Sequence, residues 1–222
     1  MSLRLITVCV LGLLLLTHSA TAQDGKTIAE KIEWTWEVTP EHPQADLPNV
    51  LLVGDSITRN YFPAVTKELT GKANVYLFAT SASLGDARLA RQLQEFFAME
   101  NKHFRVIHFN NGMHGWGFSE AEYKDAFPAL LGALHRGDPQ ARLIWANITP
   151  VRKDNPEAAT NARINARNEI AASIMKVEQI PIDDQHEVIQ QHPDLYSDDV
   201  HPNEAASAIQ GKQASAIIVK MF

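Results

Sequence analysis

The residues of this chain that could do chemistry fall into four short polar clusters. The first three come shortly after apolar runs that predict strands, and the fourth lies in the last loop before the C-terminal helix. The clusters are Gly54-Asp55-Ser56, Ser83-Leu84-Gly85-Asp86, Asn110-Asn111-Gly112 and Asp198-Asp199-Val200-His201. Serine, histidine and aspartate together are the residue types that nucleophilic acyl transfer requires, and glycine and asparagine can supply donors for an oxyanion.

Each chemical role in acyl transfer has a candidate among these residues. Ser56 can attack, His201 can take its proton, and Asp198, three residues earlier, can hold the other ring nitrogen of His201. The backbone N–H groups of Ser56 and Gly85 and the side-chain amide of Asn111 can point at one oxygen. Glycine at position 85 avoids a side chain that would block the close approach of an acyl group.

Each of these residues also has a plainer structural interpretation when it is taken alone. Ser56 could cap a turn or the start of a helix. Asp198 and His201 could form a surface pair, and Asn111 could satisfy the backbone of a turn. The occurrence of all four clusters in one chain favours the catalytic interpretation.

Alternating strand and helix patterns must bring these clusters together. Apolar runs predict strands over residues 50–53, 74–78, 105–109, 142–146 and 180–182, and helical periodicity predicts helices over residues 63–69, 86–100, 119–135, 158–177 and 203–221. This alternation predicts one α/β domain, a three-layer α/β/α sandwich around a parallel five-stranded sheet of the flavodoxin-like type. Ligands bind beyond the carboxyl ends of the strands in such a sheet, where the first three clusters lie.

The four clusters, in this order, resemble the sequence blocks of the SGNH (GDSL-type) hydrolases. Gly54-Asp55-Ser56 matches the first block, with Ile57 where the eponymous motif has Leu, and Asp198-x-x-His201 followed by Pro202 matches the last. The block with the oxyanion asparagine usually reads Gly-x-Asn-Asp, so the resemblance leaves the choice between Asn110 and Asn111 open. We favour Asn111 because it lies one residue further beyond the strand, and Gly85 corresponds to the second block. The resemblance covers residues 50–222 and implies a serine hydrolase with no cofactor.

This resemblance implies hydrolysis of a carboxylic ester, most specifically O-acetyl groups on carbohydrates or polysaccharides. Alternatives are an O-acetyltransferase acting on a cell-envelope sugar, a lysophospholipase or thioesterase, and a carbohydrate-binding protein without catalysis. We expect a small-molecule or glycan ester as the partner. The net charge of −6 includes no basic stripe, which argues against nucleic acid.

Several residues outside the four clusters are further candidates for the site. His114 and Trp116 follow the asparagine block and are expected to border the substrate pocket, and Trp34 and Trp36 could stack on a sugar or cover the core. Asp55 is expected to accept backbone N–H groups at the turn, and His108 to be a satisfied core residue. A solvated helix face or an anionic substrate could account for the cationic side chains of Arg152, Arg163 and Arg167. The remaining histidines show no metal-ligand spacing, so we expect no metal site.

The N-terminus carries the pattern of a secretory signal over residues 1–22. Arg4 precedes an apolar run at residues 5–16, and Ala20-Thr21-Ala22 fits a cleavage site. The apolar run is shorter than the roughly 20 residues of a membrane span, so cleavage is favoured over an uncleaved anchor. We expect an exported bacterial protein, periplasmic or secreted, without stable membrane insertion. An arm over residues 23–48, with a short edge strand as one option, then leads into the domain at residues 49–222.

Overall fold

The computed structural model describes residues 26–222. The predicted signal peptide lies outside the described residues. No helix within residues 26–222 combines the length and the apolar character needed to cross a bilayer.

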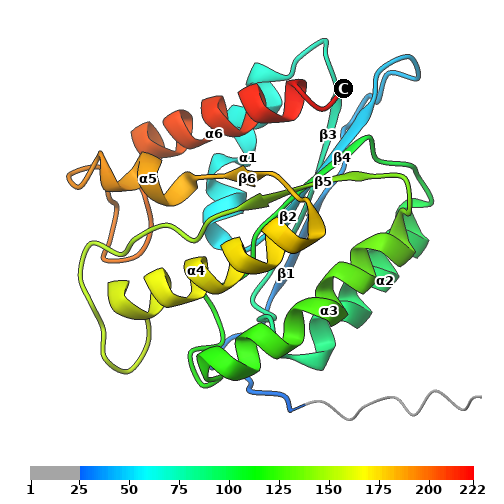
Figure 1. The fold of residues 1–222 in the computed structure, drawn as a ribbon. Helices are drawn as coiled ribbons and strands as arrows, with labels where there is room; N and C mark the ends of the chain where they lie inside the picture. The colour runs from blue at the N-terminus through cyan, green and yellow to red at the C-terminus, as the bar shows by residue number, and fades with distance from the viewer. Residues whose placement is uncertain (1–25) are drawn as a thin grey trace, which may run out of the picture.

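The described chain forms a six-stranded sheet in the order β1-β3-β2-β4-β5-β6 (Figure 1). The strands are β1 (Thr35–Val38), β2 (Asn49–Gly54), β3 (Asn74–Thr80), β4 (Val106–Phe109), β5 (Arg142–Ala146) and β6 (Ile182–Asp183). Strands β2 to β6 are parallel, whereas β1 pairs antiparallel with β3 at the edge. The predicted α/β fold with five parallel strands is confirmed. The sixth strand, antiparallel β1, comes from the N-terminal arm, where a short edge strand was one option.

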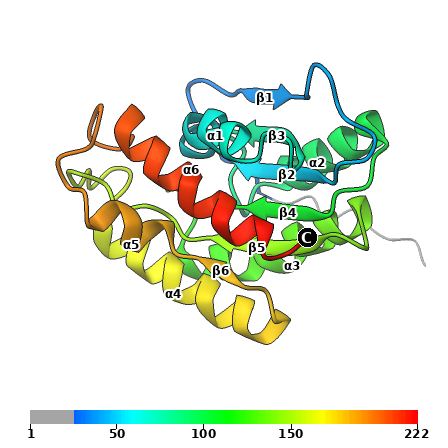
Figure 2. The ribbon, with the colours of Figure 1, turned by 90° about the horizontal axis from the view of Figure 1, so that it is seen from above.

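Helices cover both faces of this sheet, which makes three layers (Figures 1 and 2). Helices α1 and α6 lie on one face, and α2, α3 and α4 on the other, with the short α5 beside α6. Their bounds are α1 (Ser56–Glu68), α2 (Ala87–Glu100), α3 (Glu120–Gly137), α4 (Asn161–Glu178), α5 (Gln185–Gln190) and α6 (Glu204–Val219). The strands between these layers are buried on both sides, as the unbroken apolar run Val50-Leu51-Leu52-Val53 in β2 predicts.

Two helices differ from the sequence prediction for local reasons. Helix α1 begins at Ser56, seven positions before the expected start at Pro63, because the side chain of Asp55 caps it by accepting the Ile57 N–H. Pro63 therefore lies inside the helix. Helix α5 was not predicted, since its six residues are too few to establish a periodicity.

The contact between α1 and α6 sets the position of the serine and histidine clusters. Ser56 is the first residue of α1, and α6 begins three residues after His201. Gly211 lets the two helices approach closely: a Cβ there would lie 2.5 Å from the Ala64 Cβ and 3.0 Å from the Val65 backbone nitrogen. A shift between these helices would move Ser56 relative to His201.

We expect Gly211→Ala to lower the free energy of unfolding by about 1–3 kcal/mol, because the added methyl group overpacks the helix contact. Chemical denaturation measures this loss. The matched control is Gly132→Ala in α3, where the added Cβ meets only the end of the flexible Arg136 side chain at 3.0 Å. That control should gain stability, by up to about 1 kcal/mol, from helix propensity. Equal effects of the two substitutions would contradict the close-packing argument.

Candidate active site

Ser56 lies at the junction between β2 and α1. Gly54 closes the strand, and a Cβ at this position would collide with the side chain of Thr58. Asp55, which is 1% exposed, then holds the turn with a 2.9 Å hydrogen bond from the Ile57 N–H to its Oδ1. The structural role expected for Asp55 is confirmed. Ser56 is thereby placed at the carboxyl edge of the sheet and at the positive end of the α1 dipole.

A hydrogen-bonded relay joins Ser56, His201 and Asp198. Ser56 Oγ lies 2.8 Å from His201 Nε2, and His201 Nδ1 lies 2.8 Å from Asp198 Oδ2. With Nδ1–H donating to the carboxylate, Nε2 of a neutral imidazole accepts the Ser56 hydroxyl proton. The sequence prediction that these three residues come together is therefore met in the geometry.

Asp198 is oriented by the backbone of its own loop. Its Oδ1 accepts the N–H groups of Val200 and His201, both at 2.7 Å, which leaves Oδ2 for the imidazole. Partial burial raises the pKa of Asp198, but the hydrogen bonds from the His201 and Val200 backbone and from the His201 ring outweigh it and hold the pKa below its ordinary value. Asp198 is therefore ionised at neutral pH, as a residue that orients a catalytic imidazole must be.

The two adjacent asparagines point to different parts of the sheet. The Asn111 amide reaches the loop between β3 and α2: its Oδ1 accepts the Leu84 N–H at 2.5 Å and its Nδ2 donates to the Ala82 carbonyl at 2.9 Å. The Asn110 amide instead donates to the Ala146 carbonyl on β5 at 2.6 Å. Asn111 is thus tied to the segment that leads into Gly85, and the second N–H of its amide has no acceptor among the described residues.

Gly85 has a backbone conformation that suits glycine. Its φ is +105°, and a Cβ there would lie 3.1 Å from the ring of Phe118. The nearby Asn111 contact fixes the loop before it. Gly85 and Asn111 are not among the residues that line the cavity beside Ser56, so their oxyanion roles remain predictions.

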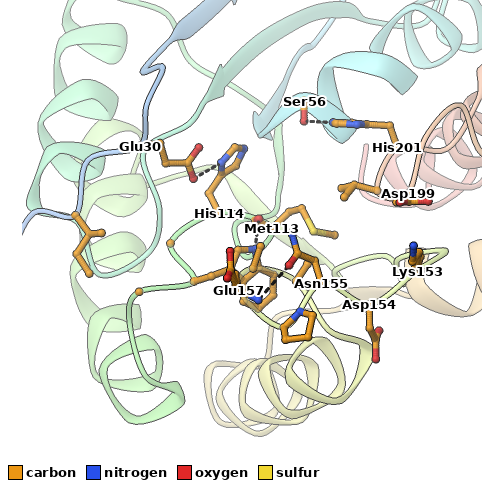
Figure 3. Close-up of a pocket in the computed structure, with 18 of the residues that line it drawn as sticks. Glu30, Ser56, Met113, His114, Lys153, Asp154, Asn155, Glu157, Asp199 and His201 are labelled. Atoms are coloured by element: carbon orange, nitrogen blue, oxygen red, sulfur yellow. Dashed lines mark hydrogen bonds and ion pairs between the residues drawn. The ribbon is translucent and has the colours of Figure 1, made fainter.

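A cavity of about 890 Å³ opens at Ser56 and His201. Figure 3 shows Glu30 and His114 on one side of it and Lys153, Asp154 and Asp199 on the other. Both predicted pocket residues, His114 and Trp116, line it. The N-terminal arm contributes Ile28, Glu30 and Trp34 to the wall. Of these, only Trp34 was a candidate from the sequence, where it could stack on a sugar or cover the core.

His114 is held by the N-terminal arm. Its Nδ1 lies 2.8 Å from Glu30 Oε1, and its ring meets that of Trp34 edge-on with the centroids 5.9 Å apart. Burial alone would lower the pKa of His114, but the hydrogen bond to Glu30 and the charges of Asp55, Glu30 and Glu33 raise it overall. Its Nε2 has no hydrogen-bond partner among the described residues. This nitrogen is itself buried, so His114 borders the cavity with other parts of the residue.

Two arginines of α4 hold the loop that carries His114 and Trp116. The Arg167 guanidinium, 1% exposed, donates to the carbonyls of Gly112, His114, Gly115 and Phe118. Arg163 donates to the Trp116 and Phe118 carbonyls and pairs with Glu120. Burial lowers the pKa of Arg167 to about 10, so it stays charged at neutral pH. Neither alternative raised for these arginines, a solvated face or an anionic substrate, describes Arg167.

A second histidine–aspartate pair lies in the core. His108 Nε2 is 2.8 Å from Asp183 Oδ2, and both residues are fully buried. Gln185 and Gln213 donate to the same carboxylate, which links β4 and β6 to α6. The expected place of His108 in the core is confirmed, but the residue is not fully satisfied, because its Nδ1 has no hydrogen-bond partner among the described residues. Within residues 26–222 no group of three or more metal-ligating side chains is found.

Comparison with solved structures identifies the architecture. A lipase/acylhydrolase from Enterococcus faecalis superposes with a TM-score of 0.63 at 15% identity, over 78% of this chain and 95% of that chain. The chain has the fold of the G-D-S-L hydrolases. A carbohydrate esterase family 3 protein from Talaromyces cellulolyticus gives 0.61 at 16% identity, over 79% and 98%. A member of the lipolytic protein G-D-S-L family from Veillonella parvula gives 0.59 at 15% identity, over 78% and 98%.

The G-D-S-L fold explains why the polar clusters meet at one edge of the sheet. The sequence itself matches neither a protein-family model nor a curated protein. The identities of 15–16% make this a likeness of fold, and the chemical roles rest on the geometry of the site.

The Glu30–His114 pair predicts a pH-dependent contribution to stability. The folded-state pKa of His114 is raised, so this stabilisation is present below the unfolded pKa of about 6.5 and is lost as pH rises through the folded value. We expect Glu30→Gln to destabilise the protein by up to about 1 kcal/mol at about pH 5–6. The difference from the unaltered protein should vanish at higher pH.

Urea denaturation across this pH range measures the effect, and an NMR titration of His114 should show its midpoint fall in Glu30→Gln. Glu178→Gln, at an exposed end of α4, is the matched control and should show no such pH-dependent difference. A difference that grows with pH would contradict the assignment.

Proposed function

We propose that the protein is a serine esterase that hydrolyses carboxylic esters, with O-acetyl groups on carbohydrates as the substrate class. The observation that carries the proposal is the relay from Ser56 through His201 to Asp198 at the wall of a large open cavity. The His108–Asp183 pair is fully buried and contacts no serine hydroxyl, so a substrate cannot reach it. The relay at Ser56 has a serine hydroxyl and opens to the cavity.

The first half of the reaction forms an acyl-enzyme. Ser56 Oγ attacks the ester carbonyl carbon while His201 Nε2 takes the hydroxyl proton, and the carbonyl electrons move onto oxygen. When the tetrahedral intermediate collapses, the carbon–oxygen bond of the ester breaks and the imidazolium gives its proton to the leaving alkoxide. Asp198 stabilises the positive imidazole throughout and keeps its own charge.

The second half repeats these steps with water. His201 removes a proton from a water molecule, which attacks the acyl carbon. The Ser56 oxygen then leaves and takes the proton back from His201. The products are the free carboxylic acid and the regenerated enzyme.

Three donors are proposed to hold the oxyanion. They are the backbone N–H groups of Ser56 and Gly85 and the free N–H of the Asn111 amide. The position of Ser56 at the start of α1 adds the partial positive charge of the helix terminus. The tie between Asn111 and the loop before Gly85 supports a shared role for these two residues.

The cavity wall supports a polar, sugar-like substrate. Trp34 and Trp116 line the cavity and contribute indole surface, which suits stacking on a sugar ring. The carbohydrate esterase fold neighbour from Talaromyces cellulolyticus is consistent with this class. We also propose export, on the grounds of the sequence pattern at residues 1–22.

Replacing the nucleophile tests the proposal directly. Ser56→Ala should lower kcat/KM for short acyl esters at least about 10³-fold, because the attacking oxygen is gone. Acetate release from an aryl acetate and from acetylated glycans measures the rate. The matched control is Ser173→Ala on the exposed face of α4, whose rate should be unchanged. Full activity in Ser56→Ala, or no turnover of any short acyl ester by the unaltered protein, would refute the esterase.

The choice between the asparagines is tested by paired variants. Asn111→Asp keeps the acceptor for the Leu84 N–H but loses the donor, so kcat should fall about 10²–10³-fold. Asn110→Ala should leave kcat within about threefold and act mainly on stability, by the roughly 1–3 kcal/mol of an unpaired buried carbonyl. Steady-state kinetics and thermal unfolding separate the two effects. The reverse pattern would assign the oxyanion role to Asn110.

A further inference from the structure

Arg59 is a cation of the cavity wall that the proposed reaction does not use. It lies three residues after Ser56 on α1, and residues at this spacing share one face of a helix. Arg59 is half-buried and lines the same cavity as Ser56 and His201. A ligand whose ester group reaches Ser56 therefore occupies a cavity that Arg59 also lines.

Within residues 26–222 the Arg59 guanidinium has no hydrogen-bond acceptor and no carboxylate within ion-pair distance. The wall contains four carboxylates, and two of them, Asp199 and Glu30, pair with other cations. Asp199 pairs with Arg152 at 2.7 Å, and Glu30 pairs with His114 at 2.8 Å. Asp154 and Glu157 also line the cavity, but neither lies within ion-pair distance of Arg59. A half-buried guanidinium with unused donors is unusual, because partial desolvation carries a cost unless an acceptor arrives.

Two tryptophans from the N-terminal arm fix the side chain in this position. The Arg59 Cζ lies 5.4 Å from the ring centroid of Trp34 and 5.1 Å from that of Trp36. Stacking against indole rings engages the faces of a guanidinium and leaves its N–H edge free to bind an oxyanion. Trp36 is 52% exposed, so contact with Arg59 explains its position better than burial in the core does.

We propose that Arg59 binds an anionic oxyacid group of the substrate, so that the preferred ester is an acylated sugar that carries a negative charge. The inference rests on the proposed esterase function and adds its substrate class. Because Ser56 and Arg59 are three residues apart on one helix face, the proposal puts the charge on the same sugar as the ester or on the next one. A carboxylate and a phosphate share the acceptor geometry that a guanidinium recognises.

Matched substrates test this assignment. The substrates are O-acetylated methyl glucuronoside, its neutral glucoside counterpart and O-acetylated glucose 6-phosphate, with acetate release as the readout. The unaltered protein should prefer at least one charged ester over the neutral one by about tenfold or more in kcat/KM. Arg59→Gln should lower that ratio about tenfold or more, while Arg59→Lys should retain part of it because the charge remains but the planar fork is lost. Comparison of the glucuronoside with the phosphate ester identifies which oxyacid is bound.

Arg91→Gln removes an exposed cation of α2 and is the matched control, with an unchanged ratio expected. Thermal unfolding confirms that the Arg59 variants fold. Equal rates on charged and neutral esters in the unaltered protein, or a ratio that Arg59→Gln does not change, would overturn the inference and leave the esterase intact.

A binding measurement separates this inference from the esterase proposal. In the Ser56→Ala background, calorimetry compares glucuronate, glucose 6-phosphate and glucose with Arg59 present and with Arg59→Gln added. Loss of acid binding on the second substitution supports the anion site even if no ester is turned over. If none of the three compounds binds in a way that depends on Arg59, the anion site is refuted whatever the outcome for Ser56.

Discussion

The hydrogen bond between Ser56 and His201 is the interaction on which the rest of the site depends, and it joins positions 145 residues apart. Ser56 is the first residue of α1, and His201 lies in the loop three residues before α6 begins. Asp55 caps the helix that starts with Ser56, and Asn203 caps the helix that follows His201 by accepting the Ala206 N–H. Between them, α1 and α6 pack closely enough to require glycine at position 211. Because an error of about 1 Å is costly in a catalytic contact, the helix packing and the two caps are part of the site.

The cavity beside this relay is built by segments that carry no catalytic group. The N-terminal arm contributes Glu30 and Trp34, and strand β1 fixes the arm to the edge of the sheet. On another side, the loop that carries His114 and Trp116 is held by the buried guanidinium of Arg167, which donates to four backbone carbonyls of this loop. Buried polar groups in such a loop would destabilise it without these donors. The arm and α4 thus define the space that a substrate can occupy.

The sequence predicted the parts of the fold that depend on local patterns. The run Val50-Leu51-Leu52-Val53 indicated a buried strand, and the periodicity over residues 119–135 indicated the helix that the structure has as α3. The order of the polar clusters was enough to predict that Ser56, Asp198 and His201 lie together. The pairing of β1 with β3 and the role of Arg167 depend instead on which distant segment lies opposite, and no local sequence pattern identifies that segment. The contacts of Glu30 with His114 and of Trp34 with Arg59 also join distant segments, so the sequence did not predict them.

The two histidine–aspartate pairs show how the surroundings of a pair, and not its chemistry, decide what it can do. His201–Asp198 and His108–Asp183 have the same 2.8 Å separation between ring nitrogen and carboxylate oxygen. The carboxylate of Asp183 also accepts from two glutamines, and its histidine has no access to solvent, so the pair can only hold strands and α6 together. In the other pair, Asp198 Oδ1 accepts two backbone N–H groups of its own loop. His201 faces the Ser56 hydroxyl at an open cavity. A proton can move usefully only in the second arrangement, because only there can a substrate receive it.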